Sequence, residues 1–241
     1  MTKQDMARLL PGLSMAGYDG SPEAIARRRA ERDAEHRKLM ADYYAGKAQS
    51  ILDKQVPPEN RGDCFERFDC EGNQVRQSVL DVCKQFGANT NDGGTLVLIG
   101  GCGRGKTLLA VSIARVYLEA HIYDLAPDSG LVYVTEQSLL ERYDRARSYR
   151  SQESTDDVMR VYSSCGMLIV DELGKWSPKR DGLAVLEQLV DHRIGLKPTI
   201  MLSNLTSEDF QARYTGGFLS RVADCCYALT GHDHRIGGDN R

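Results

Sequence analysis

The stretch that decides the fold is Ile99–Thr107, which reads IGGCGRGKT. Four of its residues are glycines, and a lysine and a threonine follow directly. Glycine is unfavourable inside strands and helices, so this spacing needs a backbone reason. Gly100–Thr107 fits the pattern G-x-x-x-x-G-K-[ST], in which a loop between a strand and a helix turns its backbone N–H groups toward phosphate oxygens. The stretch therefore predicts a site for the phosphates of a nucleotide.

The position of each residue in the motif predicts its contact with the nucleotide. Lys106 would reach the β- and γ-phosphates, and the Thr107 hydroxyl would bind Mg²⁺. A dinucleotide-binding interpretation fails, because Lys106 stands where that fingerprint needs its third glycine. The predicted nucleotide-binding residues are Gly100, Gly101, Cys102, Gly103, Arg104, Gly105, Lys106, Thr107 and Leu108.

Two adjacent carboxylates, Asp171 and Glu172, close the apolar run Met167–Val170. Charges at the end of a buried strand are costly unless they have partners. In a nucleotide site, Asp171 would hold Mg²⁺ directly or through water. Glu172 would polarise the water that attacks the γ-phosphate.

Two further polar residues complete the expected catalytic set. Asn204 follows the apolar run Thr199–Ser203 and could hydrogen-bond the attacking water or the γ-phosphate. Arg221, in the segment GGFLSRV, could reach a γ-phosphate bound by a neighbouring subunit and stabilise charge in the transition state. The predicted catalytic residues are thus Lys106, Glu172, Asn204 and Arg221.

Short apolar runs alternate with helical patterns after Gly62, which predicts an α/β fold with a parallel five-stranded sheet flanked by helices. The expected strands are Thr95–Ile99, Leu131–Thr135, Met167–Val170, Thr199–Ser203 and Cys226–Thr230. The expected helices are Gln74–Phe86, Lys106–Glu119, Leu139–Ser148, Thr155–Ser163, Leu183–Ile194 and Ser207–Tyr214.

The composition excludes several classes of protein. The chain has 241 residues and a net charge of −3, so nucleic-acid binding would need a local basic patch. We see no secretory signal and no apolar run long enough to span a membrane. Seven scattered cysteines form no disulfide framework, which favours a reducing cytoplasm. Cys225, Cys226, His232 and His234 match no common zinc-finger spacing, so we expect no zinc site.

A break near Val56–Gly62, which contains two prolines and a glycine, separates residues 1–55 from the rest. The first part begins a helix at Ser21-Pro22-Glu23 and is rich in Ala, Arg, Glu and Lys. Its apolar residues gather late, between Leu39 and Leu52. Two interpretations stay open: a solvated helix packed on the domain, or an arm that docks on a partner.

With these motifs in hand, Val56–Arg235 resembles the AAA+ ATPases of the branch that contains the DnaC-type helicase loaders and the IstB transposition ATPases. The lead-in Cys64–Phe68, the segment Asp171–Gly174 and the closing segment Gly231–Arg235 each resemble the corresponding family motifs. The resemblance implies a P-loop NTPase domain over residues 56–241, ATP with Mg²⁺ as the ligand, and no C-terminal lid domain. Arg235 would then partly replace the arginine that such a lid carries.

One position departs from the family pattern. Gly217 occupies a place where relatives often carry a second arginine. The contact between subunits would therefore rest on Arg221 alone.

The resemblance also implies partners. Loaders grip a hexameric bacterial replicative helicase through an N-terminal helical arm, which residues 1–55 would supply, and they contact single-stranded DNA. Arginines and tyrosines that suit phosphate and base contacts gather in LLERYDRARSYR, where acidic residues also support a plain solvated face. The candidate DNA-contacting residues are Arg142, Tyr143, Arg145, Arg147, Tyr149 and Arg150.

The expected function is ATP-dependent helicase loading, with self-association through Arg221. Three alternatives remain: an IstB-like helper of transposition, an adaptor that ATP switches without turnover, and a small-molecule kinase. The paired Asp171 and Glu172 disfavour the adaptor, because a switch needs no base. Asn204 and Arg221 would be coincidental in a kinase.

Overall fold

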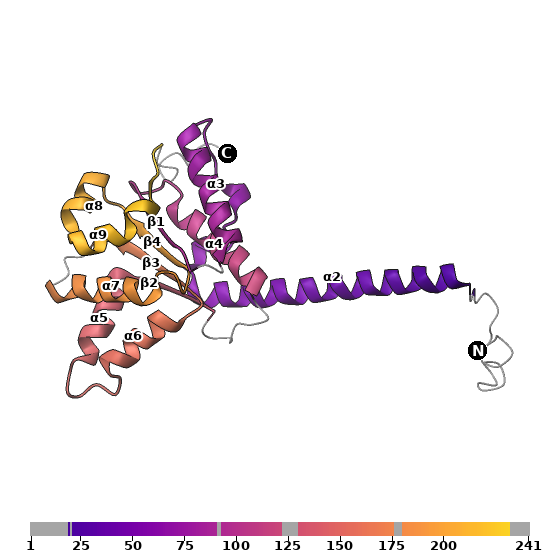
Figure 1. Cartoon of the computed structure of the whole chain (residues 1–241), viewed down its shortest axis with the longest axis horizontal. Helices are drawn as coiled ribbons and strands as arrows, with labels where there is room; N and C mark the ends of the chain where they lie inside the picture. Colours follow the sequence, from indigo (N-terminus) through magenta and orange to yellow (C-terminus); the bar gives the residue numbers. More distant parts are fainter. Residues whose placement is uncertain (1–18, 20, 91–92, 122–129, 176–179, 232–241) are drawn as a thin grey trace. The chain divides into compact units, whose positions relative to one another are not determined.

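The computed structural model describes residues 19, 21–90, 93–121, 130–175 and 180–231 (Figure 1). The chain divides into two compact units, Met1–Gly46 and Lys47–Arg241. The larger unit carries a sheet between two layers of helices, and the phosphate loop belongs to it.

A five-stranded parallel sheet forms the centre of the larger unit. The strand order β2-β3-β4-β1-β5 places β1 between β4 and β5. Because the strands run parallel, the segments that follow β1, β3 and β4 meet at one edge of the sheet, where α/β proteins bind ligands. The strands are β1 (Thr95–Ile99), β2 (Leu131–Thr135), β3 (Met167–Leu173), β4 (Thr199–Ser203) and β5 (Cys226–Ala228).

Helices cover both faces of this sheet, as Figure 1 shows. Val97 and Ile99 of β1 share a core with helices α5 to α9, whereas the alternate residues Leu96 and Leu98 point to the opposite face, toward α3 and α4. The helices are α3 (Gln74–Ala88), α4 (Lys106–His121), α5 (Glu136–Ala146), α6 (Thr155–Ser164), α7 (Arg180–Arg193), α8 (Ser207–Arg213) and α9 (Gly216–Val222), with the 3₁₀ turns η1 (Pro58–Asn60), η2 (Phe65–Arg67) and η4 (Ala223–Cys225).

The predicted α/β sheet is confirmed, and all five strands begin at the predicted residues. Several other predicted boundaries were wrong, each by one to three residues. β3 continues to Leu173 and so includes both acidic residues, while β5 ends at Ala228 instead of Thr230. Helix α5 begins at Glu136 instead of Leu139, because the Thr135 hydroxyl accepts the Ser138 N–H at 3.2 Å and caps the helix there.

A buried arginine ties the opposite edge of the sheet together. Arg193, the last residue of α7, is 0% exposed. Its guanidinium donates to the carbonyls of Tyr162 at 2.8 Å, Cys165 at 3.0 Å and Pro198 at 2.7 Å. Burial lowers the pKa of Arg193 from its ordinary value. These bonds join the end of α6 and the starts of β3 and β4, so one side chain fixes where two central strands begin.

A second arginine anchors the segment that leads into the core. Arg115 of α4 donates to the Gln49 side chain and the Arg61 carbonyl, both at 2.7 Å. It also donates to the Asp63 carbonyl at 3.3 Å. The lead-in segment, which contains η1 and η2, is therefore hydrogen-bonded to α4. Helix α4 is the helix that directly follows the phosphate loop.

Helix α2 (Pro22–Gln55) begins as predicted, with the Ser21 hydroxyl accepting the Ala24 N–H at 3.2 Å. Residues 47–55 belong to the larger unit, where Ile51 and Leu52 are buried. In the smaller unit, Leu39 and Tyr43 are 66% and 62% exposed one helical turn apart. Among the described residues, no helix is both long and apolar enough to cross a membrane.

Candidate functional site

A cavity of about 510 Å³ opens where the sheet predicts a ligand site. The phosphate loop forms its floor, and residues from β3, from the end of β4 and from the lead-in segment surround it. The lining residues are Glu59, Asn60, Asp63, Arg67, Phe68, Asp69, Arg76, Cys102, Gly103, Arg104, Gly105, Lys106, Thr107, Leu108, Asp171, Glu172 and Asn204. The structure thus brings together three of the four predicted catalytic residues and both predicted Mg²⁺ ligands.

The phosphate loop has a backbone that only glycine adopts easily. Gly100, Gly103 and Gly105 have φ values of 139°, 68° and 91°. A Cβ on Gly100 would lie 2.3 Å from the Leu229 carbonyl oxygen, and one on Gly105 would lie 2.7 Å from the Phe68 ring. Both the positive φ and the close neighbours therefore exclude a side chain at Gly100 and at Gly105.

Lys106 is 6% exposed, and its ammonium folds back on the loop that precedes it. Its Nζ donates to the Gly100 carbonyl at 2.7 Å and to the Gly101 carbonyl at 2.8 Å. An ammonium in this place can cross from carbonyl oxygens to phosphate oxygens by rotating its flexible stem.

A bulge interrupts the pairing of the two acidic residues of β3 with β4. Val170 pairs with Met201 and Leu173 with Ser203, so β3 carries one residue more than β4 at this point. Glu172 takes a φ of 59°, which costs a residue with a side chain about 1 kcal/mol or more. Such strain at an acidic residue in a cavity points to a functional role.

Each carboxylate has partners in its own chain. Asp171 accepts the Glu172 N–H at 2.6 Å and a hydrogen bond from the Tyr133 hydroxyl. Burial and the Asp171 charge raise the pKa of Tyr133, so this phenol stays a donor. Glu172 forms an ion pair with Lys175 at 2.6 Å. The oxygens of Asp171 and Thr107 form the kind of hard donor set that suits Mg²⁺.

Asn204 lies directly after β4 with its side chain exposed at the cavity. The residue before it fixes its place: the Ser203 hydroxyl donates to the Leu173 carbonyl at 2.7 Å and accepts the Leu205 N–H at 3.2 Å. Ser203 therefore fastens the end of β4 to the end of the bulge.

The sequence analysis missed Arg76 on the lead-in side of the cavity. Arg76 is 1% exposed and stacks on the Phe68 ring with 4.6 Å to the centroid. It donates to the Asp69 carbonyl at 2.6 Å and to the Thr230 carbonyl at 3.0 Å. These contacts hold the ring beneath Gly105 and join the segment after β5 to the lead-in. No sequence motif marks Arg76, because it binds backbone carbonyls, and one of them, that of Thr230, is distant in sequence.

Arg221 lies away from this cavity, which it does not line. It is the sixth residue of the short helix α9, which the sequence analysis did not predict as a helix. Its guanidinium pairs with Asp191 and with Glu187, the latter at 3.0 Å. Arg221 is therefore not part of the site formed by its own chain.

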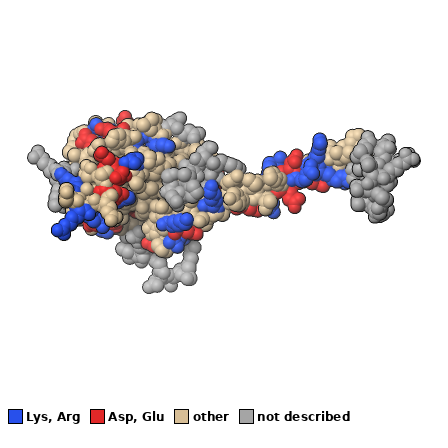
Figure 2. All heavy atoms as spheres, turned by 90° about the horizontal axis from the view of Figure 1, so that it is seen from below, with Lys and Arg blue, Asp and Glu red and all other residues tan. Residues whose placement is uncertain are grey.

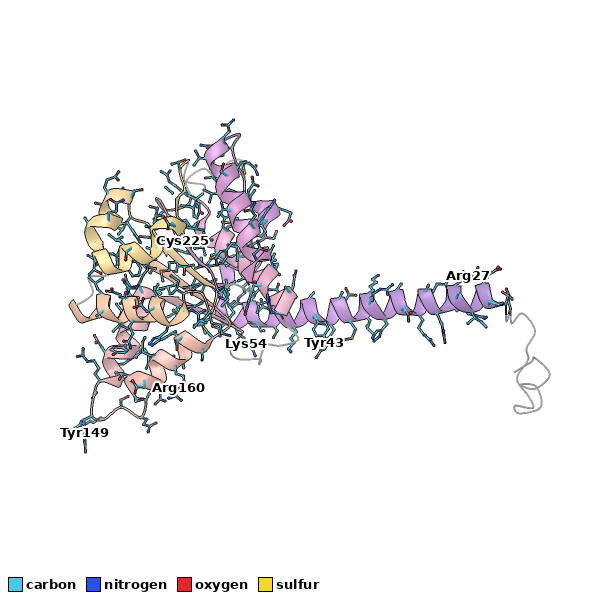
Figure 3. All side chains as sticks on the ribbon, viewed as in Figure 1. Arg27, Tyr43, Lys54, Tyr149, Arg160 and Cys225 are labelled. Carbon is cyan, nitrogen blue, oxygen red and sulfur yellow. The ribbon has the colours of Figure 1, made fainter. Side chains whose placement is uncertain are left out.

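The basic candidates separate into two groups along the α5–α6 hairpin. Arg142 makes a bidentate pair with Glu153, at 3.0 and 2.5 Å, and Tyr143 packs against the core. Both therefore have structural roles in this hairpin. The other candidates are exposed, and Tyr149 lies fully exposed near the tip (Figure 3). This second group comprises Arg145, Arg147, Tyr149 and Arg150.

Surface charge is mixed on the face shown in Figure 2, where basic and acidic side chains are interspersed. Arg235, His232 and His234 lie outside the described residues, and no group of described residues could hold a metal ion through three or more His, Cys, Asp or Glu side chains.

A family comparison fits this geometry. The family model for IstB-like ATP binding proteins matches residues 62–225, more than half of the chain. The chain belongs to this family. The cavity therefore belongs to a member of a family of ATP-binding proteins. The matched range contains every predicted catalytic residue.

Similar proteins agree on the fold. The replicative helicase loader DnaC of Buchnera aphidicola subsp. Schizaphis graminum is 25% identical over 203 residues, which cover 83% of this chain and 79% of that protein. DnaC of Escherichia coli K12 is 24% identical over 212 residues, covering 86% and 82%. The crystal structure of DnaI matches with a TM-score of 0.58 at 21% identity, covering 75% of this chain and 94% of that chain. The fold of this family member is thus that of a P-loop AAA+ domain.

A buried acid connects three parts of this ATP-binding domain. Glu136, the first residue of α5, is 0% exposed. It accepts the Gly174 N–H at 2.8 Å and a hydrogen bond from the Tyr214 hydroxyl at 3.3 Å. Gly174 follows the acidic bulge, and Tyr214 directly precedes the α9 region. Glu136 thus links the hairpin, the bulge and the α9 region, although the sequence analysis placed it outside any helix.

Glu136 predicts a pH-dependent stability. Burial raises the pKa of Glu136, so the folded chain favours the protonated acid more than the unfolded chain does. Glu136 therefore contributes fully to folding stability below its pKa in the unfolded chain. This contribution is lost as the pH rises through its pKa in the folded chain. As the pH rises through this window, the free energy of unfolding of the native chain should fall relative to that of Glu136→Gln. The fall should be up to about 1.4 kcal/mol per pH unit.

Urea unfolding of both proteins at steps from pH 4.5 to 8 measures this difference. Glu141→Gln, an exposed change on the same helix, controls for the loss of one negative charge. A difference between the native chain and Glu136→Gln that stays constant with pH would contradict a raised pKa.

Proposed function

We propose that this protein is an ATP-dependent loader that places a hexameric replicative helicase on single-stranded DNA. The observation that carries the proposal is the likeness to proteins named replicative helicase loader, which extends over about four fifths of both chains. The cavity at the carboxyl edge of the sheet supports an ATP-driven role. It is lined by the phosphate loop, by the carboxylates of Asp171 and Glu172, and by the side-chain amide of Asn204.

The phosphate loop would bind the triphosphate of ATP. Backbone N–H groups of Gly101–Gly105 and the N-terminus of α4 attract the phosphate oxygens. Lys106 would exchange the carbonyls of Gly100 and Gly101 for the β- and γ-phosphates. Thr107 and Asp171 would hold Mg²⁺, which neutralises phosphate charge when bound.

Hydrolysis would depend on Glu172. Its carboxylate takes the proton of the water that attacks the γ-phosphate, and Asn204 orients that water. In this structure the carboxylate pairs with the Lys175 ammonium. Base action requires Glu172 to exchange Lys175 for water, which the exposed position of Lys175 permits.

Arg221 would act on the ATP of a neighbouring copy. A guanidinium suits the charge that develops on the transferred phosphoryl group, and Arg221 does not line its own cavity. ATP binding would then favour association of subunits, and hydrolysis would reset the assembly.

Nucleic-acid contact would fall to the tip of the α5–α6 hairpin. Tyr149 offers an exposed ring for base stacking, and Arg145, Arg147 and Arg150 offer charges for the phosphates. Arg142 is less suited, because Glu153 already occupies its guanidinium.

The ATPase proposal predicts the effect of Glu172→Gln. The amide keeps the size of the side chain but cannot take a proton, so turnover should fall by about 100-fold or more. Binding of a fluorescent ATP analogue should stay near that of the native chain. Persistent turnover in this variant would remove Glu172 as the base. A native chain that binds ATP without any turnover would favour the adaptor alternative.

Helicase binding is predicted to require the apolar residues of the smaller unit. In the full chain, Leu39→Glu with Tyr43→Glu should abolish co-purification with a bacterial replicative helicase, because both exposed side chains would lose their apolar contacts. Leu196→Glu is the matched control, since Leu196 is 70% exposed in the larger unit.

Two outcomes would contradict this assignment. Equal capture of the double variant and the control would exclude Leu39 and Tyr43 as the docking residues. If the native chain captures none of several helicases, the transposition alternative gains, and a transposase becomes the next partner to test.

A further inference from the structure

Arg221 is held by its own chain through nearly all of its donors. Its Nε and Nη2 bind the two carboxylate oxygens of Asp191, the second at 2.9 Å. Its Nη1 donates to Glu187 at 3.0 Å and to the Gly217 carbonyl at 2.6 Å. Four of the five N–H donors of the guanidinium are therefore occupied.

The two acids lie one helical turn apart on α7, so both face α9 from the same side. Together with Arg221 they form a cluster with one more negative than positive charge. The bond to Asp191 raises the pKa of Arg221 and lowers that of Asp191. The side chains are partly exposed, at 31% for Arg221, 29% for Glu187 and 45% for Asp191. The cluster is therefore accessible to a second molecule.

Gly217 makes room for this arrangement. A Cβ at this position would lie 2.1 Å from the Glu187 Oε1 atom and 3.3 Å from the Arg221 Nη1 atom. Any larger residue at position 217 would displace Glu187 from Arg221. The departure from the family pattern at this position thus has a local consequence: it permits the second carboxylate to reach the guanidinium.

This geometry opposes contact with a phosphate. A bidentate phosphate contact needs a free guanidinium edge, and Asp191 occupies one edge while Glu187 and Gly217 occupy much of the other. The γ-phosphate of a neighbouring subunit would also meet two carboxylates beside the arginine. Like charges at this distance repel, so the phosphate must compete for Arg221.

We propose that Glu187 and Asp191 are positioning residues that hold Arg221 against its own subunit, so that ATP bound to a second copy of this chain must displace them. The proposal rests on the proposed role of Arg221 in trans. If these acids hold Arg221, subunits associate productively only when a bound triphosphate displaces Glu187 and Asp191 from Arg221. The opposite possibility, that the acids aim Arg221 for catalysis, predicts the reverse effect of removing them.

The test measures ATPase activity against protein concentration for the full chain. Asp191→Asn keeps the shape of the side chain but removes its charge. It should lower the protein concentration for half-maximal specific activity about 2- to 5-fold, the factor expected for an exposed ion pair. Glu208→Gln, on α8 outside the cluster, is the matched control and should leave the curve unchanged.

Gly217→Ala provides a second variant that leaves both acids in place. Its methyl group should push Glu187 from Arg221 and shift the curve in the same direction as Asp191→Asn. Alanine also favours the helix more than glycine does, which offsets part of the cost of this clash. Thermal unfolding of each variant checks that the fold is intact.

The Arg221→Ala background separates the two proposals. If Arg221→Ala lowers turnover, and Asp191→Asn lowers the half-maximal concentration in the native background but has no further effect in the Arg221→Ala background, the acids hold Arg221 as proposed. If Arg221→Ala lowers turnover but Asp191→Asn alone leaves or raises the half-maximal concentration, the holding role is overturned and the role in trans stands. If Arg221→Ala leaves turnover unchanged, the role in trans fails, and the holding role fails with it.

Discussion

The peptide N–H groups of Gly101–Gly105 can face an anion only while the loop is held between β1 and α4. This constraint reaches well beyond the loop. The Leu229 carbonyl lies so close to Gly100 that a side chain there is excluded, and the Phe68 ring does the same at Gly105. The segment after β5 and the lead-in segment must therefore stay in place for the loop to keep its shape, and Arg76 binds both of them.

The charged groups that would act on ATP each have a partner in this structure. Lys106 binds loop carbonyls, Glu172 binds Lys175, and Arg221 binds Asp191. The three pairs differ in burial. Lys106 is buried against the loop carbonyls, whereas the partners of the other two groups, Lys175 and Asp191, are exposed. Ligand binding would thus exchange one set of contacts for another, and the exposed pairs would break at the least cost.

Much of the fold follows from local patterns in the sequence. All five strand starts could be predicted, because parallel strands buried on both faces give continuous apolar runs bounded by breakers. The phosphate loop, Asp171, Glu172 and Asn204 were also predictable and do line one cavity, since each follows such a run.

What could not be predicted depends on contacts between distant segments. The bulge that places Glu172 at a positive φ arises from the pairing of β3 with β4. Glu136 and Arg76 bind backbone groups far along the chain, and Arg142 is occupied by a glutamate beyond the hairpin tip. Spacing along the sequence does not encode such pairings. The same holds for α9, a seven-residue helix that begins with two glycines.

If Arg221 acts on the ATP of a neighbouring copy, ATP hydrolysis needs two copies of this chain, one to bind ATP and one to supply Arg221. The most direct test mixes Lys106→Ala protein with Arg221→Ala protein and measures ATP turnover. Each variant alone should be nearly inactive. An equal mixture should recover about a quarter of the native activity, because random assembly pairs an intact phosphate loop with an intact Arg221 at that fraction of head-to-tail interfaces. A mixture no more active than the separate proteins would contradict a site shared between copies.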